Sequence, residues 1–135
     1  IDRFCGDAIL AVVGSPIPDE HQHVNAVRAA SVMQETMKLV NKRRKKEGKR
    51  FCELGIGVHH GQVLHGFIGS EERLEFTVIG DAVNRSARLC DGAPAGDILI
   101  SPELKESIGD RFKVQSNDLT DKHGVSIPAF RIDKF

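Results

Sequence analysis

A long amphipathic segment in the first half of the chain does most to limit the possible folds. From about Glu20 to Lys46, apolar residues recur at alternating gaps of four and three, at Ala26, Ala30, Met33, Met37 and Val40. This spacing predicts one helix with a single apolar stripe, on which the methionines fill the core rather than hold a cofactor. Such a stripe has to be buried, so we expect the helix to cover a sheet.

The rest of the chain alternates short apolar segments with turn residues. A hairpin with its turn at Gly6-Asp7 is predicted over residues 1–13, with a helix over Ala8 to Val13 as the alternative because that run is short. Later strands are predicted over 54–59, 62–68, 76–79, 97–100, 112–114 and 129–132. The strands between residues 54 and 79 are interpreted as a meander. The segment between the last two strands is interpreted as a polar connection.

Helix signals fall between these strands. One helix is predicted to begin at Asp81, whose carboxylate can cap the first turn, and another at Ser101, which precedes a proline; Gly109 ends the second helix. Helices interleaved with hairpins predict an α+β fold with a ferredoxin-like βαββαβ core, in which helices pack on a mainly antiparallel sheet. A chain of 135 residues with 40% hydrophobic content predicts one domain over residues 1–135.

The composition argues against several classes of partner. Nineteen basic and nineteen acidic residues balance, and the basic run from Lys42 to Arg50 is interpreted as a solvated helix end rather than a nucleic-acid patch. No apolar run approaches the roughly 20 residues that span a bilayer. Cys5, Cys52 and Cys90 form neither a disulfide framework nor a zinc motif. We therefore expect a cytoplasmic domain with no nucleic-acid partner and no direct membrane contact.

Asn84 and Arg88 are the candidate site residues that the spacing itself supports. They lie four residues apart after an apolar strand, a turn at Gly80 and the predicted helix start, so they share one helix face. An arginine offers a planar fork of donors to phosphate oxygens, and an asparagine can hold a hydroxyl or ribose oxygen. This pair is suited to a phosphate ester, although the same pattern also occurs on solvated helix faces.

Other motifs do not indicate a site. The glycines at positions 55 and 57 lack the third glycine of a dinucleotide fingerprint, and the chain contains no phosphate-binding loop of the GxxxxGK[ST] type. His59 and His60 are adjacent on a predicted strand and are expected to point to opposite faces, which argues against a histidine metal site.

Four ordered motifs, spread over nearly the whole chain, resemble the class III adenylate/guanylate cyclase catalytic domain. They are Arg3-Phe4-Cys5-Gly6-Asp7-Ala8-Ile9-Leu10-Ala11, Leu54-Gly55-Ile56-Gly57-Val58-His59-His60-Gly61, Gly69-Ser70-Glu71-Glu72-Arg73 and the stretch from Thr77 to Arg88. The resemblance implies attack of the ribose 3′-hydroxyl of ATP on the α-phosphate, which gives cyclic AMP and pyrophosphate. It also implies two Mg²⁺ or Mn²⁺ ions per site.

The resemblance assigns roles to the reacting-site residues. Asp7 matches one metal-binding aspartate, Arg88 would stabilise charge on the α-phosphate, and Asn84 would orient the ribose. The family's second metal-binding aspartate lies on a strand before the Gly-Asp hairpin. The resemblance therefore implies that the chain lacks this first strand and the helices after it, and that it is inactive by itself.

Base recognition is implied at two further positions. Members of the family that recognise adenine have a lysine at the position of Arg3 and an Asp or Thr at the position of Thr77. A cation donor and a hydroxyl suit adenine, so ATP is favoured, with GTP as the alternative. Lys122 is implied to contact the triphosphate.

The resemblance also implies a homodimer in which each site is composed from both subunits. The alternatives are a guanylate cyclase and a non-catalytic cyclase-homology module that dimerises or binds nucleotide as a regulator. A diguanylate cyclase is disfavoured because the chain has no GG[DE]EF segment.

Overall fold

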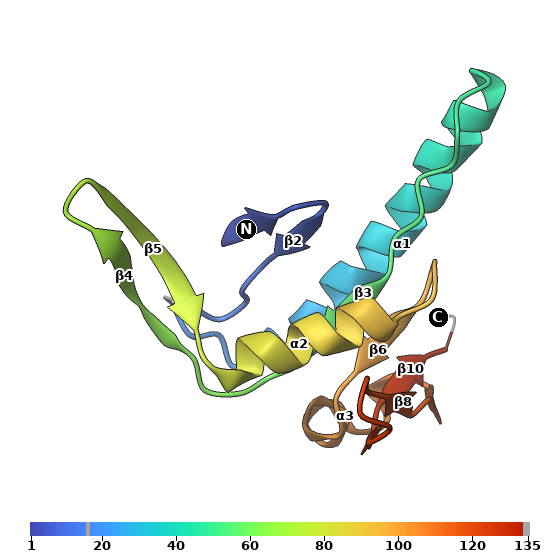
Figure 1. The fold of residues 1–135 in the computed structure, drawn as a ribbon. Coiled ribbons are helices and arrows are strands. Elements are labelled where there is room, and N and C mark those ends of the chain that lie inside the picture. The colour runs from blue at the N-terminus through green and yellow to red at the C-terminus, as the bar shows by residue number, and fades with distance from the viewer. Residues whose placement is uncertain (16, 134–135) are drawn as a thin grey trace.

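A computed structural model describes residues 1–15 and 17–133 of the chain. It describes their side chains except at positions 3, 5, 68, 70 and 73–77. The elements are β1 Arg3–Cys5, β2 Ala8–Leu10, α1 Gln22–Lys46, β3 Ile56–Val58, β4 Leu64–Ser70, β5 Arg73–Ile79, α2 Asp81–Gly92, β6 Ile98–Ile100, α3 Pro102–Ile108, the 3-10 turn η1 Gly109–Arg111, β7 Val114–Ser116, β8 Leu119–Thr120, β9 Ser126–Ile127 and β10 Phe130–Ile132 (Figure 1).

A four-stranded sheet in the order β3-β6-β10-β7 forms the centre of the domain, and three two-stranded ribbons, β1–β2, β4–β5 and β8–β9, surround it. β10 pairs antiparallel with both β6 and β7, whereas β3 pairs parallel with β6. The predicted α+β class is thus confirmed, with mainly antiparallel pairing.

The predicted meander between residues 54 and 79 is wrong. β3 pairs with β6, and β4 and β5 form a separate ribbon that projects from the body (Figure 1). The physical reason is α2, which packs on both β3 and β6. Parallel neighbours need a crossover connection, and this helix supplies it.

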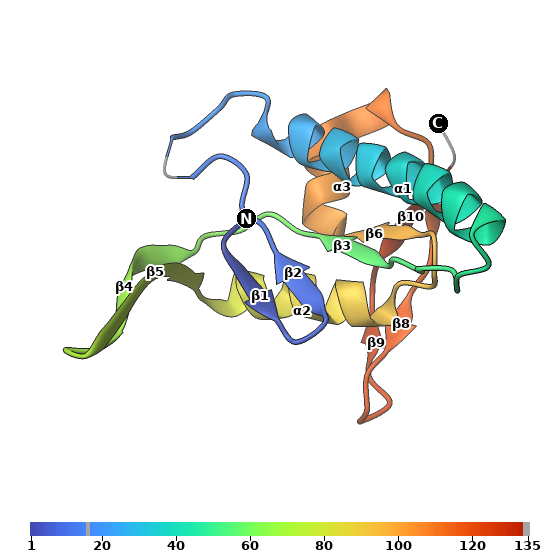
Figure 2. The same cartoon turned by 90° about the horizontal axis from the view of Figure 1, so that it is seen from above.

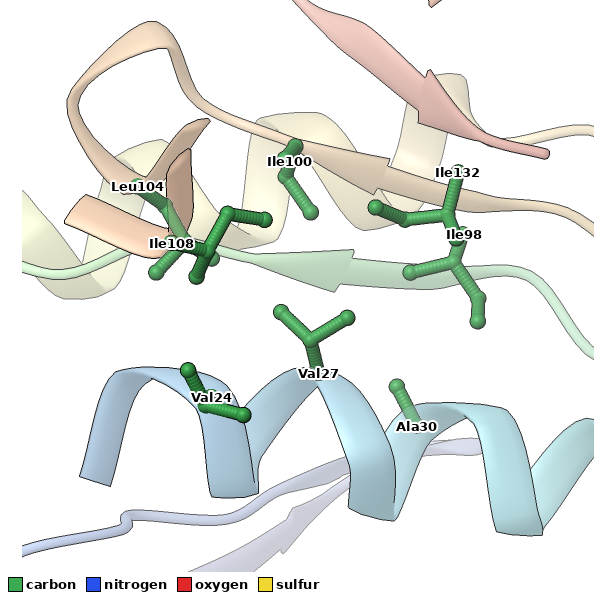
Figure 3. Close-up of a cluster of buried hydrophobic side chains, with 8 residues drawn as sticks. All are labelled: Val24, Val27, Ala30, Ile98, Ile100, Leu104, Ile108 and Ile132. Atoms are coloured by element: carbon green, nitrogen blue, oxygen red, sulfur yellow. The ribbon is translucent and has the colours of Figure 1, made fainter. Parts of the chain in front are cut away.

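Helices cover both faces of the sheet, with α1 and α3 on one face and α2 on the other (Figure 2). Alternate residues of β6 pack against the helices on the two faces of the sheet, because successive side chains of a strand point to opposite faces. Ile98 and Ile100 face α1 and α3, whereas Leu99 packs with Leu89 of α2 and Ala129. The first cluster comprises Val24, Val27, Ala30, Ile98, Ile100, Leu104, Ile108 and Ile132 (Figure 3).

The apolar stripe of α1 differs from the prediction. The buried positions are Val24, Val27, Ala30, Ser31 and Gln34. Of the predicted stripe Ala30 alone is buried, and Met33 is 47% exposed, so its predicted core role is wrong. The reason is length: the C-terminal part of α1 extends past the sheet (Figure 1), so burial ends before residue 37.

Helix boundaries follow local chemistry. The predicted cap at Ser101 is confirmed, because its Oγ accepts a hydrogen bond from the Leu104 N–H at 3.3 Å. Gly109 ends α3 with φ +60°, as predicted. The predicted cap at Asp81 is wrong: Gly80, with φ +141°, is the N-cap residue, and Asp81 is the first helical residue without a side-chain cap.

Gly57 allows α2 to lie close against β3. A Cβ atom at this position would lie 2.3 Å from the backbone N of Cys90 and 2.7 Å from the carbonyl carbon of Leu89. We expect Gly57→Ala to lower the free energy of unfolding by about 1–3 kcal/mol, because the helix has to move. Urea unfolding measures this change, with Gly66→Ala as control because that site has open space. Equal losses in both variants would contradict the steric explanation.

Candidate active site

The α2 helix presents a cation and an amide on one exposed face. The Gly80 carbonyl accepts hydrogen bonds from the N–H groups of Val83 at 3.1 Å and Asn84 at 3.5 Å, so the helix starts directly after β5. Asn84 and Arg88 follow one turn apart, and both are exposed. Among the described residues, neither side chain makes a hydrogen bond or an ion pair, so both are available to a ligand.

Arg88 borders a small hollow between α2 and the following elements. Arg85, Leu89 and Ser101 line the hollow together with Ile127 and Pro128, which lie at the end of β9. The β8–β9 ribbon reaches α2 because Leu119 packs against the α2 cluster around Leu89. The sequence predicts only a polar connection between the strands at 112–114 and 129–132. The β8–β9 ribbon, which forms one wall of the hollow, is therefore not predicted.

Arg85, one residue after Asn84, is held in place by an ion pair. Its Nη1 lies 2.9 Å from Oε1 of Glu103, and its Nη2 donates to Oε2 at 3.1 Å. The hydrogen bond from Arg85 holds the pKa of the Glu103 carboxyl below its usual value. Arg85 is not among the predicted site residues, because nothing in the sequence links residues 85 and 103.

His59 lies beneath this ion pair. Its side chain is 3% exposed, and its Nδ1 lies 2.7 Å from the Ser101 Oγ and 3.9 Å from the Glu103 carboxylate. The prediction that His59 and His60 point to opposite faces is wrong: their rings are stacked with centroids 6.1 Å apart. β3 ends at Val58, so strand alternation does not apply to them.

Two histidines are expected to make the stability of the fold depend on pH. Burial lowers the pKa of His59, and burial together with the nearby His60 lowers the pKa of His23. In the unfolded chain a histidine titrates near pH 6.5, so below that pH the unfolded state binds more protons. We therefore expect the free energy of unfolding to fall between pH 7.5 and pH 5.5, above the range in which carboxylates titrate.

Urea unfolding at both pH values tests this expectation. His59→Asn should reduce the difference between the two free energies, whereas His123→Asn, at an exposed turn position, should leave it unchanged. The same pH dependence in His59→Asn and the unsubstituted chain would contradict the assignment to His59.

Asp7 lies in the two-residue turn of the β1–β2 hairpin and is exposed. Gly6 has φ +63°, which suits the first turn position of a type II′ hairpin. Burial is the main reason that the pKa of Cys90 is raised, followed by the neighbouring Asp91 carboxylate, and the Asp7 carboxylate adds a smaller effect. Cys90 is two residues after Arg88, about 200° around the helix. Among the described residues, none of the first hairpin lines the hollow beside Arg88.

The remaining predicted site residues lie apart along the chain. Arg3 pairs with Leu10 in the first hairpin, and Thr77 pairs with Gly66 in the second, but the side chains of both lie outside the described part of the structure. Lys122 is exposed in the turn between β8 and β9, which the Asp121 carboxylate shapes by accepting the His123 N–H at 2.8 Å. The structure thus describes Asn84 and Arg88 as one group and Asp7 and Lys122 as separate positions.

Comparison with known proteins decides the family. The family model of the adenylate and guanylate cyclase catalytic domain matches residues 3–129 of this chain. The chain belongs to this cyclase family. Among curated relatives, an uncharacterized protein of Mycobacterium tuberculosis is 36% identical over 117 residues, which cover 85% of this chain and 20% of that protein. The terminal-differentiation specific adenylate cyclase of Dictyostelium discoideum is also 36% identical, over 93% of this chain and 6% of that protein.

Solved cyclase structures have the same fold. The guanylyl cyclase Cya2 is 34% identical with a TM-score of 0.84, covering 98% of this chain and 67% of that one. The adenylyl cyclase CyaB from P. aeruginosa is 26% identical with a TM-score of 0.90, covering 99% of this chain and 71% of that one. This cyclase domain spans about a fifth of the mycobacterial relative. The relatives thus include both adenylyl and guanylyl cyclases.

The donors of this cyclase domain suit a hard divalent cation only in part. No group of three or more His, Cys, Asp or Glu side chains that could hold a metal is found among the described residues. The exposed Asp7 carboxylate is the kind of oxygen ligand that Mg²⁺ accepts alongside water and substrate phosphates.

The described helices include none that is long and apolar enough to cross a bilayer.

Proposed function

We propose that this chain is part of a catalytic nucleotidyl cyclase that converts ATP to cyclic AMP and pyrophosphate. The observation that carries the proposal is the exposed pair Asn84 and Arg88, which share a helix face and have no partner among the described residues. A structural arginine would be paired, as Arg85 is. An unpaired guanidinium one turn from an amide is suited to a phosphate next to a ribose.

The proposed reaction is an in-line displacement. The ribose 3′-hydroxyl attacks the α-phosphorus, the bond to the pyrophosphate oxygen breaks, and the hydroxyl proton leaves to solvent or a nearby base. Negative charge develops on the α-phosphate oxygens, and the Arg88 guanidinium neutralises it in the transition state. Asn84 holds the ribose so that the hydroxyl faces phosphorus.

Asp7 would hold a divalent cation, Mg²⁺ or Mn²⁺, in this proposal. When bound, such an ion polarises phosphate oxygens and favours ionisation of the attacking hydroxyl. Two ions per site need further carboxylates besides Asp7. We propose that a further strand outside this chain supplies them, because β3 pairs with β6 alone among the described strands and is the edge strand of its sheet. This chain by itself is then inactive.

We favour ATP over GTP from residues 3 and 77. Arg3 supplies a cation donor and Thr77 a hydroxyl, which match the ring nitrogen and exocyclic amine of adenine. Guanine would instead favour a carboxylate at position 77. Lys122 is proposed to contact the triphosphate as a point charge.

We propose a homodimer with sites composed from both subunits. Asp7 lies in the turn of the first hairpin, and no described residue of that hairpin lines the hollow beside Arg88, so in this proposal a second copy brings the two together. Exposed apolar side chains support a second copy: Leu64 and Phe67 of the β4–β5 ribbon are 67% and 72% exposed, and Phe4 and Ile9 of the first hairpin are 72% and 59% exposed.

The test is cyclic nucleotide formation from ATP and from GTP, with Mg²⁺ or Mn²⁺. It is made on this chain and on a longer chain that extends upstream of Ile1. Cyclic AMP from the longer chain supports the proposal, and cyclic GMP would correct the base assignment. A folded dimer that forms neither product would instead indicate a regulatory cyclase-homology module.

A further inference from the structure

The ion pair between Arg85 and Glu103 joins the helix that carries Asn84 and Arg88 to α3. Both side chains are partly buried, with 35% and 44% of their surfaces exposed. Nη2 of Arg85 donates a hydrogen bond to Oε2 of Glu103 at 3.1 Å, and Nη1 lies 2.9 Å from Oε1, so two contacts fix their relative orientation. Among the described residues of α2, two side chains, Arg85 and Cys90, make polar contacts with other parts of the fold. The second is the Cys90 thiol, which donates to the Gly55 carbonyl at 3.4 Å near the other end of the helix.

The position of Arg85 on α2 makes its contact relevant to the site. Its side chain leaves the helix about 100° from Asn84 and about 60° from Arg88, so it flanks the face that they share. The apolar anchor Leu89 and the Cys90 contact lie in the C-terminal half. The Arg85–Glu103 pair therefore restrains rotation of the N-terminal half about the helix axis.

Glu103 is itself held from several sides. The buried His59 lies 3.9 Å from its carboxylate and is fixed by the Ser101 hydroxyl at 2.7 Å. The backbone carbonyl of Glu103 lies 3.0 Å from Nε2 of His60 and accepts the Ser107 hydroxyl at 3.1 Å. The His60 ring in turn packs at a tilt against the ring of His23 of α1, with centroids 4.5 Å apart. These contacts hold Glu103 in place, so its carboxylate can in turn hold the Arg85 side chain.

We propose that Glu103 is a positioning residue for the cyclase reaction: its ion pair with Arg85 sets the rotation of α2 and hence the direction of Asn84 and Arg88. This inference rests on the proposed function. Glu103 does not touch substrate in this role and acts through Arg85. A half-exposed pair contributes little to the stability of the whole fold, so its effect should appear in the site rather than in unfolding.

The kinetic test uses Glu103→Ala, Arg85→Ala and their combination, in whichever form of the protein produces cyclic nucleotide. We expect each single variant to lower kcat about tenfold with KM little changed, since misplaced groups cost rate mainly in the transition state. The double variant should lose no more than either single variant, because both act through one pair. Glu103→Gln, which can still accept a hydrogen bond, should retain more activity. Glu106→Ala on the same helix is the matched control and should behave as wild type.

Hydrogen exchange gives a second readout that does not need activity. We expect Glu103→Ala to speed exchange of the amides of residues 85–88, while the core strand β6 and the midpoint of unfolding stay near their wild-type values. Unchanged exchange, unchanged kcat, or losses that add in the double variant would overturn the proposal. A wild-type protein that forms no cyclic nucleotide would overturn the proposed function, and the exchange data would still decide whether Glu103 holds α2.

Discussion

Arg88→Ala is expected to lower kcat for cyclic nucleotide formation about 10²- to 10³-fold, the range seen when one donor to a developing oxyanion is removed. Arg88 is exposed, and among the described residues it has no protein partner, so the loss should fall on the reaction rather than on folding. KM should change much less than kcat, because charge on the α-phosphate builds up only as the new bond forms. Initial rates at several substrate concentrations measure both parameters.

The control for Arg88 is an arginine of similar exposure away from α2. Arg111 in the turn after α3 is exposed, and Arg111→Ala should leave kcat and KM at wild-type values. Thermal unfolding should give the same midpoint for both variants within a few degrees. If Arg88→Ala keeps full activity, the phosphate role assigned to this helix face is wrong.

The sequence predicted the Asn84 and Arg88 face because every signal for it is local. The apolar strand, Gly80 and the helix that follows occupy consecutive residues, and one helical turn fixes the relation between residues 84 and 88. The same holds for the Ser101 cap and the Gly109 stop. Such features depend on a few neighbouring residues, so the structure changed only the cap of α2, from Asp81 to Gly80.

Non-local relations could not be obtained in this way. The parallel pairing of β3 with β6 depends on α2 filling the crossover, and the apolar pattern of β3 alone does not choose its neighbour. The pairing of Arg85 with Glu103 joins residues 18 positions apart in sequence on two different helices. The stripe of α1 was placed wrongly because the sheet covers only its first half, and sequence period does not show where a neighbour ends.

Mixing two inactive variants should restore activity if the sites are composed from both subunits. Asp7→Asn and Arg88→Ala are each expected to be nearly inactive, in the longer chain if this chain alone forms no product. In a mixed dimer, one site combines both substitutions and the other has an intact Asp7 and an intact Arg88. Random assortment makes about half of the dimers mixed, each with one of two sites intact, so about a quarter of wild-type activity should return.

The geometry of a single chain is the reason to expect this result. Asp7 lies in the turn of the first hairpin, and no described residue of that hairpin lines the hollow beside Arg88, so we expect an ion held at Asp7 to meet the Arg88 of a second copy. Mixing Asp7→Asn with Asp7→Ala is the control and should restore nothing. If the two different variants also stay inactive together, while sedimentation shows that mixed dimers form, each site draws Asp7 and Arg88 from one subunit, and the composite arrangement is wrong.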